Sequence, residues 1–278
     1  MKTTPSSERA FSRVDLLALL SVLALLAIAF GADGQSSGRA AVCQNNMRLL
    51  MRAQFLYAAD NGYFPPNAVD IQTPGSIWVG GNVSFGSESN LNSTMNSMLS
   101  VYLERDPRPF KCPSAPTIPR SRFVISRSVS MNHAVGTDPM DTDGPCKRPV
   151  PGIWLDATAG HQANSKFRCF ARPSDIVNPS PENLFIFVDE HQDSVNDAVF
   201  ASMGPATPGA YRWIDVPAAY HDGSGSFGFA DGRAQLHQWV QPFVPPSRVF
   251  PVVSPTPGQR LDLQWLAAHT SALRAAQP

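Results

Sequence analysis

The strongest constraint on this chain is an apolar run near its N-terminus. Residues Leu16 to Phe30 are apolar except for Ser21, and a polar leader with Lys2, Arg9 and Arg13 precedes them. A helix that crosses a bilayer needs about 20 predominantly apolar residues, so this run lies near the lower limit. The sequence therefore predicts either a helix that stays with the protein as a membrane anchor or a signal that is removed on export.

Three interpretations of this run compete. In an ordinary secretory signal, Ala27-Ile28-Ala29 would supply the small residues of a cleavage site. A simple retained anchor is the second interpretation. The third is a type IV prepilin signal, which the leader resembles because Ala10 precedes the aromatic Phe11, and Asp15 would be the fifth residue after cleavage between them. The resemblance implies that a prepilin peptidase cuts there and that the helix is kept.

The acid at position 15 has a physical reason in that family. A free amine at Phe11 would be a charge in a low-dielectric environment, and an unpaired charge is costly there. The Asp15 carboxylate of a neighbouring subunit can pair with this amine and set the register of assembly. The same carboxylate is unfavourable inside an ordinary secretory signal.

Composition narrows the class of partner. Positive and negative side chains balance at a net charge of zero, and only 16% of residues are charged, so neither a nucleic-acid-binding protein nor a solvating acidic tail is predicted. Pro is abundant, with 26 residues against 19 Gly, which favours loops and short elements after the first helix.

Four cysteines, Cys43, Cys112, Cys146 and Cys169, form no Cys-x-x-Cys pair, which argues against a zinc knuckle or a redox motif. An even number of cysteines in an exported domain favours two disulfides. We expect Cys43 to pair with Cys112 and Cys146 with Cys169, because the second pair closes the shorter loop. Free buried thiols are the alternative.

Local patterns predict several elements. Apolar residues recur at helical spacing from Arg39 to Asp60, whereas Phe123–Asn132 alternates apolar and polar residues like a strand. The apolar run Leu184–Val188 predicts a buried strand. A hairpin is expected around Asp231-Gly232, and a short terminal helix within Asp262–Ala275.

Further motifs widen the resemblance to a large bacterial family of pseudopilin-like proteins. The family carries a Cys-x-Asn-Asn helix, a Phe-x-Cys-Pro element, an Arg-Ser-x-Ser-Met-Asn strand, an Asp-Glu-His run and a His-x9-Asp-Gly motif. Here these correspond to Cys43–Arg48, Phe110–Ser114, Arg127–Asn132, Pro179–Asp197 and His221–Gly232.

The resemblance implies an α+β, pilin-like fold, in which a long N-terminal transmembrane or amphipathic helix packs on an antiparallel sheet with long loops. Residues 1–10 would be the leader, 11–62 the helix with a membrane span at about 14–32, and 63–278 the globular domain. The protein would be a non-enzymatic subunit of a type II secretion or type IV pilus-like assembly. It would cross the inner membrane once, with its globular domain in the periplasm or outside the cell and other pilin-like subunits as partners.

The densest polar cluster follows the predicted buried strand and includes the His-x9-Asp-Gly motif. Alternation in a strand would place Asp189, His191 and Asp193 on one face. A structural hydrogen-bond network, a structural divalent cation such as calcium, and a catalytic metal are the three interpretations. The candidate residues are Asp189, Glu190, His191, Asp193, Asp197, His221 and Asp231.

Two other functions remain as alternatives. A secreted metal-dependent hydrolase would bring His191 and His221 together in an open cleft. A carbohydrate-binding module would expose Trp78, Trp154 or Trp213 in a row. The sequence has no His-Glu-x-x-His or phosphate-binding motif. A pilin-like subunit instead predicts both histidines buried or tied to the hairpin, and a continuous helix from near Phe11.

Overall fold

The computed structural model describes residues 13–69, 76–80, 94–116, 127–141, 147–156, 166–205, 211–245 and 254–275. Between residues 13 and 36, side chains are described only for Leu17 and for Leu19 to Val22. The chain divides into two units, Met1–Arg39 and Ala40–Pro278. We describe each unit by itself.

The first element is the helix α1, Arg13–Asn61, which is continuous through the polar segment 31–38. It ends where the sequence predicts, because Gly62 adopts a left-handed φ of 81° and donates its N–H to the carbonyl of Ala58. Two prolines, Pro65 and Pro66, then prevent another helical turn. The predicted continuous helix is thus confirmed over the described residues.

The predicted membrane span at 14–32 is wrong. Within the part of the chain that the structure describes, no helix combines the length and the apolar character needed to cross a membrane. The apolar run Leu16–Phe30 has 15 residues, and at a rise of 1.5 Å each it extends for only about 22 Å, compared with a hydrocarbon core of about 30 Å. The predicted single-pass transmembrane fold is corrected accordingly.

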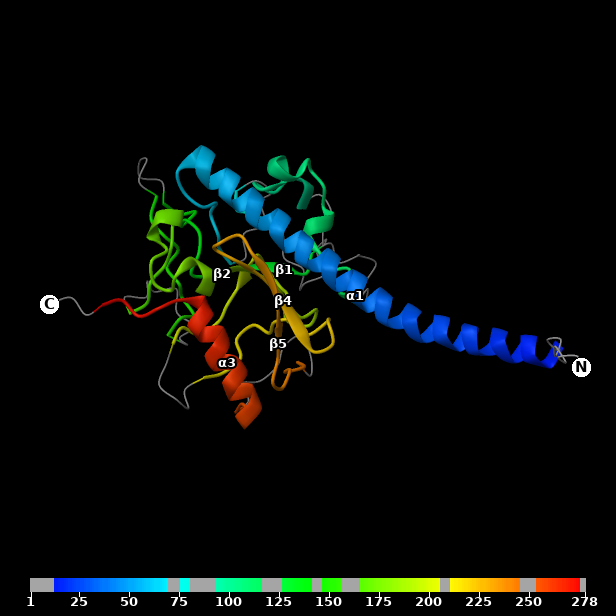
Figure 1. Ribbon diagram of the computed structural model, residues 1–278. Coiled ribbons are helices and arrows are strands. Elements are labelled where there is room, and N and C mark those ends of the chain that lie inside the picture. Colours follow the sequence, from blue (N-terminus) through cyan, green and yellow to red (C-terminus); the bar gives the residue numbers. More distant parts are fainter. Residues whose placement is uncertain are drawn as a thin grey trace, which may run out of the picture. The chain divides into compact units, whose positions relative to one another are not determined.

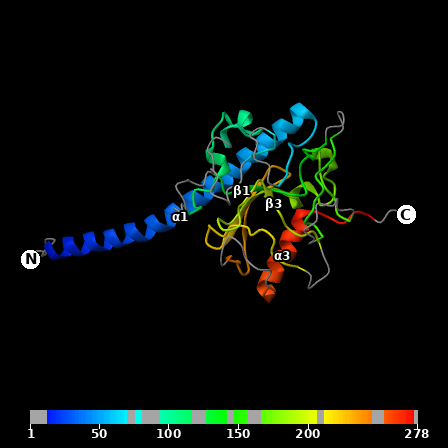
Figure 2. The same cartoon turned by 180° about the vertical axis from the view of Figure 1, so that it is seen from behind.

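The second unit is built on a five-stranded sheet with the order β3-β1-β2-β4-β5. Its strands are β1 Val129–Asn132, β2 Phe185–Asp189, β3 Val199–Phe200, β4 Ser224–Phe229 and β5 Ala234–Gln238. The sheet is mixed and not antiparallel as expected, because the two-residue strand β3 pairs parallel with β1 at one edge. Figure 2 shows β3 beside β1 at that edge.

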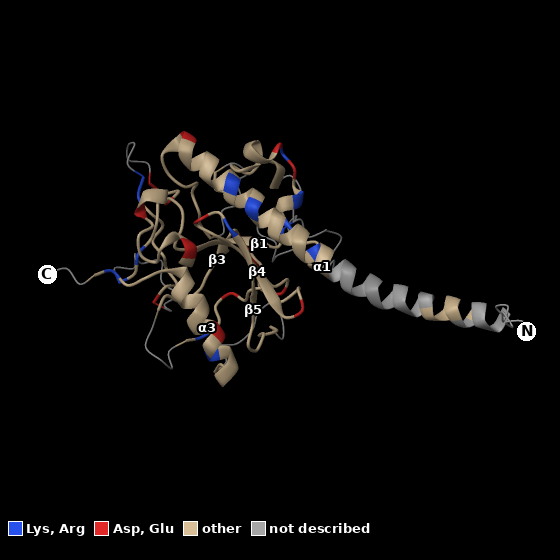
Figure 3. Ribbon diagram, viewed as in Figure 1, with Lys and Arg blue, Asp and Glu red and all other residues tan. Residues whose placement is uncertain are grey.

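The part of α1 in the second unit packs on one face of the sheet (Figure 1). Met47, Leu50 and Met51 are fully buried, at the i, i+3 and i+4 spacing of an apolar helix face. The helix approaches β4 so closely that a Cβ atom at Gly228 would lie 2.9 Å from Cγ of Met51. Arg48, beside this face, is exposed, and Figure 3 shows basic residues along the part of α1 that lies in the second unit.

The helix α3, Pro257–Thr270, covers the other face of the sheet (Figures 1 and 2). It begins five residues before the expected start at Asp262, because Thr256 and Gln259 form a capping box around Pro257. Leu263 and Leu266 pack against a core that the aromatic side chains of β2 and β4 dominate.

Short 3₁₀ helices connect the main elements. They are η1 Ser100–Leu103, η2 Arg108–Phe110, η3 Pro173–Asp175 and η4 Pro181–Asn183.

The predicted buried strand and the predicted hairpin are both confirmed. Every residue of β2 is buried. Strand β4 pairs antiparallel with β5 across the turn at Gly232, whose φ is 89°. Together these elements bring β2, the η2 loop, α1 and the turn before β4 to one place.

Candidate metal centre

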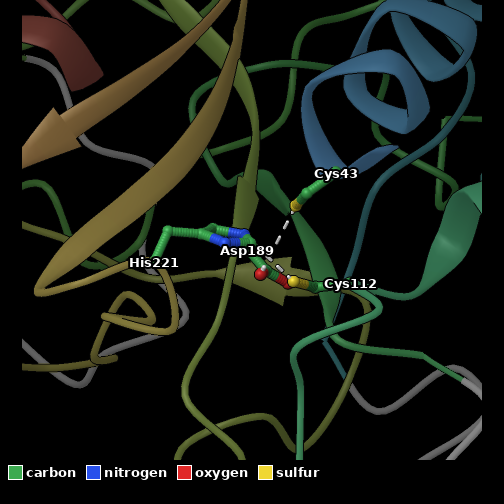
Figure 4. Close-up of side chains that lie close together, drawn as sticks. All are labelled: Cys43, Cys112, Asp189 and His221. Atoms are coloured by element: carbon green, nitrogen blue, oxygen red, sulfur yellow. Dashed lines mark hydrogen bonds between the residues drawn. The ribbon is translucent and has the colours of Figure 1, made fainter. Parts of the chain in front are cut away.

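Four side chains from four separate segments converge beside the buried end of β2 (Figure 4). They are Cys43 of α1, Cys112 in the loop after η2, Asp189 at the end of β2, and His221 in the turn before β4. One sulfur, oxygen or nitrogen atom of each lies within 4.8 Å of those of the other three. We call these four residues the thiol cluster.

Two direct contacts define the geometry of the thiol cluster. Sγ of Cys112 lies 3.3 Å from Nε2 of His221, and Sγ of Cys43 lies 3.9 Å from Oδ2 of Asp189 (dashed in Figure 4). All four residues are buried, with relative exposures from 0% to 5%. The four side chains of the cluster are therefore enclosed by protein.

Local hydrogen bonds hold the cluster's side chains in place. The hydroxyl of Ser128 donates to Oδ1 of Asp189 at 2.5 Å and accepts from the backbone N–H of Cys112 at 2.8 Å. The N–H of Ser114 points to Sγ of Cys112 at 3.4 Å. These bonds leave Oδ2 of Asp189 and the sulfur of Cys112 facing the centre of the cluster.

Asn46 ties α1 to the loop that carries Cys112. It lies three residues after Cys43, nearly one helical turn away. Its side-chain amide donates to the carbonyls of Arg108 and Lys111, both at 3.2 Å. The Cys-x-Asn-Asn segment thus supplies both a thiol to the cluster and a clamp on the neighbouring loop.

The surroundings disfavour negative charge on the cluster. Burial raises the pKa of the Asp189 carboxyl well above its ordinary value. The hydrogen bond with Cys43, together with burial, raises the pKa of the Cys112 thiol. Burial lowers the pKa of the His221 imidazole. In the absence of a cation, burial thus disfavours charge on Asp189, Cys112 and His221.

The donor set indicates which ions this cluster suits. Two thiolates, one imidazole and one carboxylate are ligands that Zn²⁺ accepts in tetrahedral sites. Calcium, the example of a structural cation considered in the sequence analysis, prefers six to eight oxygen ligands, and the thiol cluster offers a single carboxylate. The sulfur and nitrogen donors of the thiol cluster therefore suit zinc better than calcium.

Of the predicted polar residues, the thiol cluster contains two, Asp189 and His221. Glu190 directly follows the last residue of β2 and points to the other side, where it accepts hydrogen bonds from Ser130 at 2.5 Å and Ser194 at 2.7 Å. Burial raises its pKa to about 8. Glu190 thus belongs to a separate buried hydrogen-bond network.

The expected shared face of Asp189, His191 and Asp193 is wrong, because β2 ends at Asp189. The chain then turns, and the N–H groups of Ser194 and Val195 both reach the carbonyl of His191. Nδ1 of His191 accepts from the N–H of Asp193 at 3.1 Å. His191 and His221 consequently have different partners and do not converge in a cleft.

The remaining candidates have local roles. Asp197 accepts from the N–H of Val199 at the start of β3. Asp231 pairs with Arg233 across the hairpin turn, at 3.2 Å between Oδ2 and Nε. The histidine and the aspartate of the His-x9-Asp-Gly motif therefore serve different ends of β4.

The cysteines are thiols and form no disulfide among the described residues. Cys43, Cys112 and Cys169 are free, which corrects the expected bond between Cys43 and Cys112, although these two do meet in the thiol cluster. Cys146 lies outside the described residues, as do Ala10 and Phe11, and the side chain of Asp15 is not described either. The expected pairing of Cys146 with Cys169 therefore lies partly outside the described residues, and Cys169 itself is a free thiol.

The aromatic residues expected on an exposed face are mostly buried. Trp78 is fully buried and Trp213 is 5% exposed, while Trp154 is half-buried. The described residues therefore present no row of these three tryptophans to solvent, which removes the observation on which a carbohydrate-binding module would rest.

Sequence reasoning missed the two thiols as ligands. Cys43 and Asp189 are 146 residues apart, and Cys112 and His221 are 109 residues apart, so no short spacing links them. One feature of the sequence could have indicated the site: each residue of the thiol cluster belongs to a different one of the motifs described in the sequence analysis.

Comparison with known proteins found no matching family model, no curated protein and no solved structure with significant similarity to this chain.

Proposed function

We propose that this chain is a non-catalytic structural subunit, and that the apolar first part of α1 packs among the equivalent helices of other pilin-like subunits. The observation that carries the proposal is the exposure of Leu17, Leu19, Leu20 and Val22, whose relative exposures range from 48% to 67%. Exposed large apolar side chains so close together along a helix mark an interaction site.

The direction of these side chains favours several partners over one. Successive residues of a helix are separated by about 100°, so positions 17, 19, 20 and 22 point to different sides of the helix. A helix that is apolar all round is stable only when it is surrounded. Copies of the same helix provide a matching surface, as in a bundle of identical subunits.

Two further points support the proposal. The motifs described above resemble those of pseudopilin-like proteins, for which the resemblance implies a type II secretion or type IV pilus-like assembly with the globular unit outside the cytoplasm. The continuous helix from Arg13 to Asn61 supplies one element that belongs to both the assembly region and the globular unit.

The thiol cluster does not favour an enzyme. A catalytic zinc site keeps one coordination position open for water or substrate. Here all four donors come from the protein and are buried. His191, the other histidine of the hydrolase alternative, contacts Asp193 and Tyr220.

Oligomer formation by the full chain tests the proposal. Replacing both Leu17 and Leu20 with Gln keeps helix propensity but removes apolar surface. We expect the association constant, measured by sedimentation velocity, to fall at least about 100-fold, since each buried leucine contributes about 1.5–3 kcal/mol. The matched control is Leu261→Gln on α3, because Leu261 is 56% exposed. A wild-type chain that stays monomeric, or equal effects of both changes, would contradict the proposal.

Processing by a prepilin peptidase gives an independent prediction. Mass spectrometry of the chain isolated from its native host should find a mature N-terminus at Phe11, with Asp15 as the fifth residue. Ala10→Leu should block cleavage because the site follows a small residue. A mature chain that begins near Phe30 or Asp33 would show an ordinary secretory signal and would remove the assembly helix.

A further inference from the structure

We propose that the thiol cluster binds one Zn²⁺ ion in a closed four-ligand site, and that this ion fastens α1 to the sheet. The ligands are Sγ of Cys43, Sγ of Cys112, a carboxylate oxygen of Asp189 and an imidazole nitrogen of His221. The inference is independent of the proposed assembly, since it concerns the second unit alone.

Two separations lie close to those of a tetrahedral zinc site, and all the ligand atoms lie within 4.8 Å of one another. Zinc–ligand bonds of about 2.0–2.3 Å place the ligand atoms of a tetrahedron roughly 3.3–3.8 Å apart. Sγ of Cys112 and Nε2 of His221 are 3.3 Å apart, and Sγ of Cys43 and Oδ2 of Asp189 are 3.9 Å apart. Small side-chain movements therefore suffice to accommodate the ion.

The surrounding hydrogen bonds are those that support a metal site. Ligating carboxylates are usually hydrogen-bonded at the oxygen that does not face the metal, and Ser128 occupies that oxygen of Asp189. The N–H of Ser114 points at the Cys112 sulfur and would stabilise a thiolate. Asp189 and Cys112 are thus preoriented by their own neighbours.

The origin of the ligands defines what the ion would do. One comes from α1, one from the η2 loop, one from β2 and one from the turn that leads into β4. An ion bound to all four links segments that are far apart in the sequence, and its binding free energy contributes to folding. The site would stabilise the docking of α1 and would leave no position for a substrate.

The first test is metal binding by the reduced wild-type chain. Purified protein, freed of metal with a chelator, is titrated with Co²⁺ alone and then with Zn²⁺. We expect about one Co²⁺ per chain in a tetrahedral environment, with intense visible bands and a sulfur-to-cobalt charge-transfer band. Zn²⁺ should displace the cobalt and raise the melting temperature.

Variants identify the ligands. Cys43→Ser and Cys112→Ser should each remove about half of the sulfur-to-cobalt band, because each removes one of two thiolates, and His221→Gln should weaken zinc binding at least about tenfold. Cys169→Ser is the matched control, since Cys169 is also a free thiol but lies outside the cluster. It should bind Co²⁺ like the wild type.

The wild-type measurement decides the matter even if a variant fails to fold. Absence of the charge-transfer band in a folded wild-type chain whose thiols are reduced would overturn the proposal. So would a Cys43–Cys112 disulfide in protein isolated from the native host without added reductant, or a band that Cys169→Ser abolishes. None of these outcomes bears on the oligomer test with Leu17 and Leu20.

Discussion

Replacing Asn132 with Asp should destabilise the globular unit by at least about 3 kcal/mol, which is a large share of the stability of an ordinary domain. Asn132 is fully buried at the end of β1. Its side-chain amide donates to the carbonyl of Phe185 in β2 and to that of Thr270 at the end of α3, each at 2.9 Å. A carboxylate has no hydrogen to donate and would face both carbonyl oxygens.

Urea denaturation at neutral pH measures the effect. The matched control is Asn61→Asp, because the Asn61 amide also donates to a carbonyl, that of Tyr57, but on the exposed end of α1. Water can replace that bond, so we expect little or no change in the free energy of unfolding. Equal effects of both substitutions would show that Asn132 does not join β1, β2 and α3 as described.

Replacing Trp78 with Ala should lower the free energy of unfolding by about 3–5 kcal/mol, the usual range for removing a large buried aromatic side chain. Trp78 is fully buried and packs against Phe110 and Phe187, with ring centroids 6.3 and 5.1 Å away. Its indole N–H also donates to Oδ1 of Asn67 and to the carbonyl of Ala198, both at 3.1 Å.

Two further substitutions separate the contributions. Trp78→Phe keeps an aromatic ring but leaves two buried acceptors without this donor, so the loss should be smaller, at about 1–3 kcal/mol. Trp154→Ala is the control for tryptophan removal at a half-buried position, and it should cost less than Trp78→Ala. A Trp78→Ala chain as stable as the wild type would contradict the burial of this side chain.

Trp78 also illustrates what local sequence conceals. It lies in a stretch rich in Gly, Ser and Asn, which predicts a loop and, with it, an exposed aromatic ring. Its burial depends on α1, β2 and the segment before β3, which contribute the other walls of the same core. A loop residue is buried or exposed according to what packs over it, and its neighbours in sequence do not carry that information.

The sequence alone determined the elements whose signals are local. The apolar spacing from Arg39 to Asp60 specified a helix with one buried face, and Gly62 with the prolines after it specified its end. The apolar run before Asp189 specified a buried strand, and Asp231-Gly232 specified a hairpin turn. In each case the residues that decide the conformation are only a few positions apart.

Tertiary structure alone decided the sheet's edge and the candidate metal centre. The two residues of β3 are too few to show a period, and their parallel pairing with β1 depends on where the chain returns. Cys43 and Cys112 read as a disulfide pair, and Asp189 and His221 as parts of a larger polar cluster. Only the packing of α1, the loop after η2, β2 and the turn before β4 against one another places these four side chains within 4.8 Å, because metal ligands are selected by distance in space and not by spacing along the chain.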